Sequence, residues 1–127
     1  MKKKIINTIS APPPIGPYSQ AVKAGKLLFV SGQIPINSIT GQVVLNDIEA
    51  ETRQVMQNIE AILSAAELNF SNIVKTTIFL KDMNNFAKVN EIYGSYFQNE
   101  FPARETVEVS RLPKDVNVEI SVIATEL

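Results

Sequence analysis

The stretch FPARETVEVSRLPKDVNVEI, residues 101–120, predicts two β-strands joined by the segment RLPKD, because β-branched residues alternate with other types on both sides of it. Followed to Thr125, the second strand places only apolar residues on one side and a mixture on the other, since side chains alternate with a period of two. The apolar set is Val116, Val118, Ile120, Val122 and Ala124, and the mixed set is Asn117, Glu119, Ser121, Ile123 and Thr125. We expect helices to cover the apolar set, and the mixed set to face water or a subunit interface.

Two amphipathic helices are predicted upstream of this stretch. From Ile48 to Ala66, apolar residues recur at steps of three and four, which is the spacing of one helical face. Either Asn46 or Asp47 can cap the N-terminus of this helix. A second helical face comprises Phe86, Val89, Ile92, Tyr93, Tyr96 and Phe97.

Further strands are predicted on either side of the first helix. The segment YSQAVKAGKLLFVSGQIP, residues 18–35, has the pattern of two strands joined by a turn at AGK. The segment NIVKTTIFL, residues 72–80, is rich in β-branched residues. The order of elements predicts one domain over residues 1–127, an α+β two-layer sandwich with a mixed sheet and both helices on one face.

Composition excludes several classes of protein and of site. The net charge is −1, with 12 basic and 13 acidic residues, which argues against a nucleic-acid partner. No apolar stretch approaches the roughly 20 residues of a membrane span, so we expect a soluble, cytoplasmic protein with a solvated Lys2–Lys4 run. The absence of histidine and cysteine excludes a thiol nucleophile and the usual zinc sites, and no metal site is predicted. Acid–base chemistry would therefore fall to Asp, Glu, Lys, Tyr or water.

Two charged residues stand out in the last two predicted strands. Arg104 shares one face of its strand with Thr106 and Glu108, and Glu119 lies between Val118 and Ile120. If the strands pair as a hairpin, Arg104 and Glu119 could approach one another within a subunit or across an interface. They could form a structural salt bridge on a solvated face. Alternatively, the planar fork of the arginine could bind a substrate carboxylate while the glutamate positions and deprotonates water.

Three other positions have both a structural and a functional interpretation. Tyr18 follows a proline-rich run, Ala11–Pro17, and could pack at the edge of the core or be delivered to a site by an ordered loop. Asn90, on the second helix, could be a solvent-facing amide or form a hydrogen bond to a neighbouring loop. Gly32, in VSGQIP, could mark a plain strand end or allow a ligand to approach the backbone closely.

Together, the segments IGPYSQAV, VSGQIP, IVKTTIFLKDMNNFAKVN and FPARETVEVSRLPKDVNVEI resemble the Rid family of enamine/imine deaminases, close to its RidA subgroup. The resemblance extends over essentially the whole chain, with the motifs in the expected order. It implies a chorismate-mutase-like α+β fold and a homotrimer in which three sheets form a central barrel. It also implies that the active sites lie in clefts between subunits.

The resemblance implies an activity as well. The family hydrolyses 2-aminoacrylate and 2-aminocrotonate, as their imine tautomers 2-iminopropanoate and 2-iminobutanoate, to a 2-keto acid and ammonia. It uses no cofactor. The partners of this chain would then be small 2-imino and 2-keto carboxylic acids and two further copies of itself.

Roles are carried over by motif. The arginine of PAR is Arg104, which would bind the substrate carboxylate, and the glutamate of VEI is Glu119, which would position the attacking water. The tyrosine of GPY is Tyr18, which would line the pocket. Ser31 and Gly32, in SGQ, would contribute to substrate binding.

The remaining positions include two departures from the family pattern. Asn90 of FAKVN belongs to the implied binding site, and Thr106 stands where the subgroup often has cysteine. Glu105 stands where a small residue is usual, and alternation points it away from the face of Arg104. A non-catalytic trimer that binds small carboxylates, as a regulator or chaperone, is the alternative. It would retain Arg104 and could dispense with Glu119.

Overall fold

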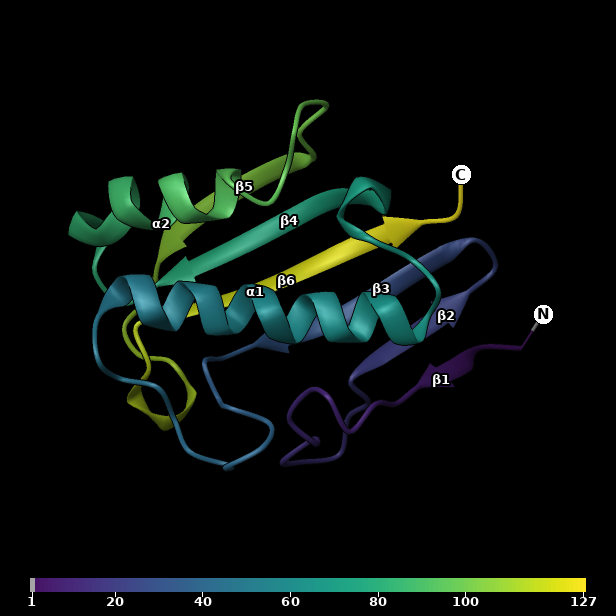
Figure 1. The fold of residues 1–127 in the computed structure, drawn as a ribbon, viewed down its shortest axis with the longest axis horizontal. Coiled ribbons are helices and arrows are strands. Elements are labelled where there is room, and N and C mark those ends of the chain that lie inside the picture. The colour runs from purple at the N-terminus through teal and green to yellow at the C-terminus, as the bar shows by residue number, and fades with distance from the viewer. Residues whose placement is uncertain (1) are drawn as a thin grey trace.

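Within residues 2–127, which the computed structural model describes, two α-helices cover one face of a six-stranded sheet (Figure 1). The predicted two-layer α+β sandwich is therefore confirmed. No helix in this range is both long and apolar enough to span a membrane. The strands are β1 Lys4–Ile6, β2 Ala21–Ala24, β3 Leu27–Gln33, β4 Ile73–Leu80, β5 Ala103–Glu108 and β6 Val118–Thr125. The helices are α1 Ile48–Ala65 and α2 Phe86–Gly94, with 3-10 turns at Phe70–Asn72, Met83–Asn85 and Pro113–Asp115.

The strand order across the sheet is β1-β2-β3-β6-β4-β5. Strand β4 pairs with β5 in parallel and with β6 antiparallel, so the sheet is mixed, as predicted. A hairpin of β5 and β6 is wrong, because β4 lies between them. The RLPKD segment makes a 3-10 turn at Pro113–Asp115 between buried Leu112 and Val116, and it carries the chain past the end of β4 instead of folding β6 back onto β5.

The strand β1 and the end of α2 also differ from the expectation. Lys4 opens β1, which pairs antiparallel with β2 at the sheet edge, and Ile6 is buried. Only Lys2 and Lys3 remain as a solvated lead-in. A strand of three residues is too short to show a periodicity, which is why the sequence did not predict it. Helix α2 ends at Gly94, so Tyr96 and Phe97 pack against the core from the turn that follows.

Helix α1 forms where its cap and its apolar face agree. Asp47, in extended conformation, accepts a hydrogen bond of 2.7 Å from the backbone N–H of Ala50, which satisfies one of the free donors of the first turn. Glu49 lies in the same turn, at the positive end of the helix dipole. The buried side chains of the helix are Glu51, Thr52, Val55, Met56, Asn58, Ile59, Ile62 and Leu63.

The core lies between the helices and the sheet, and the last strand divides as predicted. Val118, Ile120, Val122 and Ala124 face the helices and are at most 3% exposed. The mixed side lies on the open face, which no helix covers within residues 2–127. Apolar side chains of other strands also remain exposed to solvent: Leu27, Phe29 and Val107 are 40%, 42% and 41% exposed.

Replacing the helix cap should lower stability without changing the fold. In Asp47→Ala, the N–H of Ala50 loses its partner, so we expect the free energy of unfolding to fall by about 1 kcal/mol in denaturant titrations. Asn46→Ala is the matched control, since the neighbouring amide does not cap the helix. An equal loss in both variants would contradict the assignment of Asp47 as the cap.

Candidate active site

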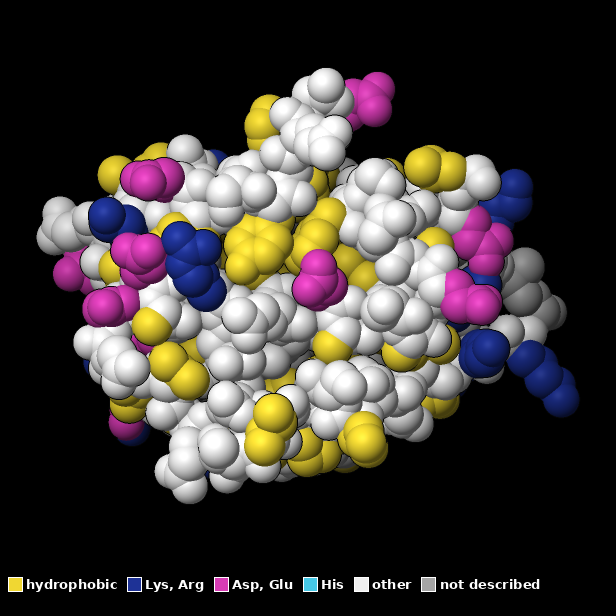
Figure 2. Space-filling model, in the orientation of Figure 1, with side chains coloured by type: hydrophobic (Ala, Val, Ile, Leu, Met, Phe, Trp, Pro, Cys, Tyr) yellow, Lys and Arg dark blue, Asp and Glu magenta, His cyan; other side chains and the backbone are white. Residues whose placement is uncertain are grey.

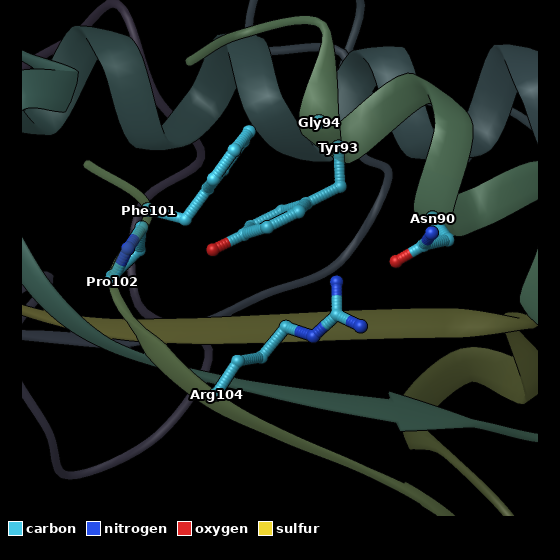
Figure 3. Close-up of a pocket in the computed structure, with 6 residues that line it drawn as sticks. All are labelled: Asn90, Tyr93, Gly94, Phe101, Pro102 and Arg104. Atoms are coloured by element: carbon cyan, nitrogen blue, oxygen red, sulfur yellow. The ribbon is translucent and has the colours of Figure 1, made fainter. Parts of the chain in front are cut away.

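Arg104 lies on the edge strand β5 and reaches up between the sheet and α2 (Figure 3). Its guanidinium carbon is 5.2 Å from the ring centroid of Tyr93 and 5.7 Å from that of Phe86, so two aromatic faces hold the cation. Within residues 2–127, no carboxylate lies within salt-bridge distance of it. A cavity of about 470 Å³ opens beside the guanidinium, and its lining residues are Asn90, Tyr93, Gly94, Phe101, Pro102 and Arg104.

Tyr93 is itself fixed from below. Its hydroxyl donates a 2.8 Å hydrogen bond to Oγ1 of Thr76, and both residues are buried. Burial raises the pKa of Tyr93, although the bond to Thr76 and the nearby Arg104 oppose the shift. The ring therefore stays a neutral, immobile surface against which the long arginine side chain is held.

Two other predicted residues flank Arg104. Asn90, exposed on α2, points its amide toward the guanidinium (Figure 3). Thr106 lies two residues along β5 on the same face, and its Oγ1 is buried without a hydrogen-bond partner among residues 2–127. A buried hydroxyl without a partner costs stability unless another group completes it. Arg104, Asn90 and Thr106, together with the cavity, form what we call the arginine half-site.

Glu119 lies on β6 on the open face of the sheet. Its side chain lies over Gly32, where a Cβ atom would stand 2.9 Å from Cδ of the glutamate, so a larger residue at this position would displace the carboxylate from where it lies. Burial raises the pKa of Glu119. Within residues 2–127, no hydrogen bond or ion pair to its carboxylate offsets this burial. A cavity of about 340 Å³ adjoins it, and the lining residues are Ile15, Tyr18, Ser31, Gly32, Ile34, Pro113 and Glu119.

The backbone around Gly32, beside this cavity, is irregular. The pairing of β3 with β6 shifts register between Val30 and Gln33, as at a β-bulge, and bulges commonly redirect side chains beside active sites. Ser31 is held there by two contacts, since its N–H donates to the carbonyl of Gln20 (2.9 Å) and its hydroxyl to that of Ser19 (2.6 Å).

Tyr18 is delivered by the proline-rich loop, as expected. Its hydroxyl oxygen accepts a 3.2 Å hydrogen bond from the N–H of Ile15, and the residue is 49% exposed. The loop depends on Gln20, a buried amide that the sequence did not single out. The Gln20 amide nitrogen donates to the carbonyls of Thr8, Ala11 and Pro12, and its oxygen accepts from the N–H of Thr8. We call Tyr18, Ser31, Gly32 and Glu119 the glutamate half-site.

The two half-sites lie on opposite faces of one sheet. Arg104 is paired in register with Thr76, which is buried beneath the helices, whereas Glu119 is paired with Phe79, which belongs to the open face. An approach of Arg104 to Glu119 within one subunit, and a structural salt bridge between them there, are therefore wrong. The seven predicted site residues form two clusters in a single chain and not one.

Glu105 behaves as alternation predicts. Its carboxylate lies on the open face, 2.7 Å from Nζ of Lys75, and accepts a hydrogen bond from the hydroxyl of Thr77. These two donors hold the pKa of Glu105 below its ordinary value. The negative charge of Glu105 is thus paired with Lys75 on the side of the sheet away from Arg104. No group of three or more His, Cys, Asp or Glu side chains able to hold a metal occurs within residues 2–127.

The sequence matches the family described as endoribonuclease L-PSP over residues 8–126. A RutC family protein of Pyrococcus horikoshii is 58% identical over 122 residues, which cover 96% of this chain and 97% of that protein. YyfA of Yersinia pestis, of the conserved Rid protein family, is 55% identical with a TM-score of 0.96, over 98% of this chain and 100% of that one. The chain belongs to the Rid family.

Other Rid-like structures agree with this assignment. Escherichia coli TdcF, solved with bound serine, is 44% identical with a TM-score of 0.94, over 98% of this chain and 99% of that one. The YjgF gene product of E. coli is 50% identical with a TM-score of 0.93, over the same shares of the two chains. The resemblance that the motifs indicated and the chorismate-mutase-like fold are therefore confirmed.

The opposite pKa shifts of two glutamates on the open face predict opposite effects on stability. The folded-state pKa of Glu119 is raised, so its ionisation costs stability as the pH rises through that pKa. Glu119→Gln should therefore be more stable than the wild type at neutral pH. The gain should disappear below the pKa of an unfolded glutamate. Chemical denaturation at fixed protein concentration across pH measures it.

Glu105→Gln is the matched control, with the same chemical change on the same face. The folded-state pKa of Glu105 is lowered, so its contribution is present above the unfolded pKa and is lost as the pH falls through the folded one. This variant should lose stability at neutral pH. A stabilising Glu105→Gln, or a destabilising Glu119→Gln, would contradict the two environments described above.

Proposed function

We propose that the chain is a homotrimeric, cofactor-independent deaminase. Its substrates are 2-iminopropanoate and 2-iminobutanoate, the imine tautomers of 2-aminoacrylate and 2-aminocrotonate, and its products are a 2-keto acid and ammonia. The observation that carries the proposal is the division of the site. Among residues 2–127, the arginine half-site has no paired anion and the glutamate half-site no paired cation, and the two lie on opposite faces of one sheet. Membership of the Rid family supports it.

The division of the site supports assembly with other copies. A single chain cannot bring Arg104 to Glu119, but a neighbour can place its arginine half-site against the glutamate half-site of the first. The open face also has too much apolar surface, at Leu27, Phe29 and Val107, to be left in water. Cyclic symmetry closes such heterologous contacts, and three copies would enclose the open faces as a barrel.

The proposed reaction begins with the substrate carboxylate. Arg104 offers a planar fork of donors, already oriented by Tyr93 and Phe86, and binds the carboxylate through two parallel hydrogen bonds. Thr106 supplies the unpartnered hydroxyl beside it, and Asn90 an amide at the rim of the cavity. These groups fix the imine carbon in front of the carboxylate of the neighbouring Glu119, and orientation of this kind lowers the barrier.

Hydrolysis follows at the imine carbon. Water forms a C–O bond there while the C=N π electrons move to nitrogen, and Glu119 accepts the proton that the water loses and passes it to that nitrogen. In the resulting aminol, the hydroxyl proton passes to nitrogen, the C–N bond breaks, and ammonia leaves as the keto C=O forms. Burial of Glu119 strengthens the carboxylate as a base, since its raised pKa favours proton uptake. Tyr18, with Ser31 and Gly32, forms the wall that confines the water.

A second candidate function is a trimer that binds small carboxylates without catalysis. The bound serine in E. coli TdcF, an amino acid with the same carboxylate group, favours it. Under this alternative the partly buried Glu119 has no catalytic role. Release of keto acid and ammonia from enzymatically generated 2-aminoacrylate separates the two, because a binding protein would not accelerate it.

Cleavage of RNA, to which the family description refers, has less support. Binding of a phosphate backbone requires clustered basic residues. On the helical face, basic and acidic side chains are intermixed, and hydrophobic side chains gather between the helices (Figure 2). The net charge is −1 and the chain contains no histidine to serve as the usual general base.

Arg104 variants test the carboxylate contact. In Arg104→Ala we expect kcat/KM for imine hydrolysis to fall, because the transition state loses about 2–4 kcal/mol of binding energy. This is the cost of losing one member of a buried charge pair. Arg104→Lys should be nearly as poor, since the ammonium lacks the fork. Wild-type turnover in either variant would refute the role of Arg104.

Mixed assemblies test whether two chains share a site. Arg104→Ala and Glu119→Gln subunits, each inactive alone, are unfolded together and reassembled. An interface is intact when the first variant supplies Glu119 and the second supplies Arg104, so about a quarter of the sites should recover in a cyclic trimer.

The control mixes Arg104→Ala with Arg104→Lys. Both damage the same half-site, so no interface can be intact and no activity should return. If the Arg104→Ala and Glu119→Gln mixture also stays inactive while trimers form, the site is not shared between chains.

A further inference from the structure

The substrates proposed above reach water first as enamines, and the enamine carbon C3 must gain a proton before the imine carbon C2 can be attacked. We propose that Glu119 in its protonated form delivers this proton to C3 inside the site, so that the protein takes up the enamine itself and catalyses both tautomerisation and hydrolysis. This inference rests on the proposed function, and it adds an acid step to the role of Glu119.

The position of Glu119 suits an acid as well as a base. No donor or cation within residues 2–127 is bonded to its carboxylate, so none of these residues favours the ionised form at the expense of the neutral one. Ile15, Ile34 and Pro113 line the same cavity and keep it apolar. Such apolar surroundings favour the neutral carboxylic acid over the carboxylate. The burial that raises the pKa of Glu119 therefore increases its protonated fraction.

The other groups of the glutamate half-site are poorer acids. Ser31 donates its hydroxyl proton to the carbonyl of Ser19 and is not free. The hydroxyl oxygen of Tyr18 accepts a hydrogen bond from the N–H of Ile15, and a phenol is in general a weaker acid than a carboxylic acid. The chain has no histidine or cysteine. Among the residues lining this cavity, Glu119 is the strongest proton donor.

The proton count closes without any other reactant. The carboxylic acid of Glu119 gives its proton to C3 as the C=C π electrons form the new C–H bond and the nitrogen lone pair completes the iminium. Glu119 is now a carboxylate, as the hydrolytic step requires. It then takes the proton of the attacking water and returns to the acid form. Because C2 and C3 are bonded neighbours, a group that holds water at C2 is also within reach of C3.

A deuterium experiment reads this step directly. A PLP-dependent dehydratase generates 2-aminocrotonate from threonine in D₂O, with and without this protein, and 2-oxobutanoate is reduced at once by a dehydrogenase to preserve C3. Protonation in solution places deuterium on either side of C3. Delivery by Glu119 comes from one side, so with the protein we expect faster keto-acid release and one predominant configuration at C3, relative to the dehydratase alone.

A preformed imine substrate and two variants show whether Glu119 is the acid. Preformed 2-iminobutanoate, produced from 2-aminobutanoate by an amino-acid oxidase, needs no proton at C3, so its enzymatic hydrolysis should be fast and add no deuterium there. With 2-aminocrotonate, Glu119→Gln should give the C3 configuration of the dehydratase alone. Tyr18→Phe should retain the enzymatic configuration in whatever product it releases, whereas loss of the configuration in this variant alone would make Tyr18 the acid and overturn the inference.

The failure of this inference is distinguishable from that of the proposed function. Accelerated keto-acid release with the C3 configuration of the dehydratase alone would overturn the acid role of Glu119 and leave the hydrolysis intact. Absence of acceleration with both the enamine and the preformed imine would overturn the proposed function, and the inference with it.

Discussion

The position of β4 between β5 and β6 is the constraint on which the site depends. Side chains paired in register share a face, so Arg104 joins Thr76 under the helices and Glu119 joins Phe79 on the open side. Only the first of these faces is covered by the chain itself. Each half-site therefore has its orienting neighbours in place within one chain, and under the proposed function a second copy supplies the other half.

The local patterns of the sequence predicted most of the fold. The periodicity of α1, a cap at Asn46 or Asp47 and the division of β6 into an apolar and a mixed side depend on neighbours along the chain, and all three hold, with Asp47 as the cap. The hairpin of β5 and β6 failed because strand pairing depends on long-range contacts that alternation does not encode. β4 supplied a better partner for both strands. Strand β1, at Lys4–Ile6, was missed because three residues carry no period.

The motifs named candidate residues for the site, but they could not predict how these residues are grouped. Motifs identify side chains and say nothing of which face of the sheet each one takes relative to the others. The supporting residues were invisible for a related reason. Tyr93 looked like a core residue on a helix, and Gln20 like one polar residue among many. Their roles, holding Arg104 and the Tyr18 loop, arise only from tertiary hydrogen bonds and stacking.

In the proposed assembly, one active site consists of an arginine half-site and a glutamate half-site from two copies of the chain. A crystal structure with bound 2-oxobutanoate, the keto acid product, tests it most directly. We predict a trimer in which the carboxylate of the ligand is held by Arg104 of one subunit and its keto carbon faces Glu119 of the next. A ligand bound to a single subunit, or at a position that touches neither Arg104 nor Glu119, would contradict the account.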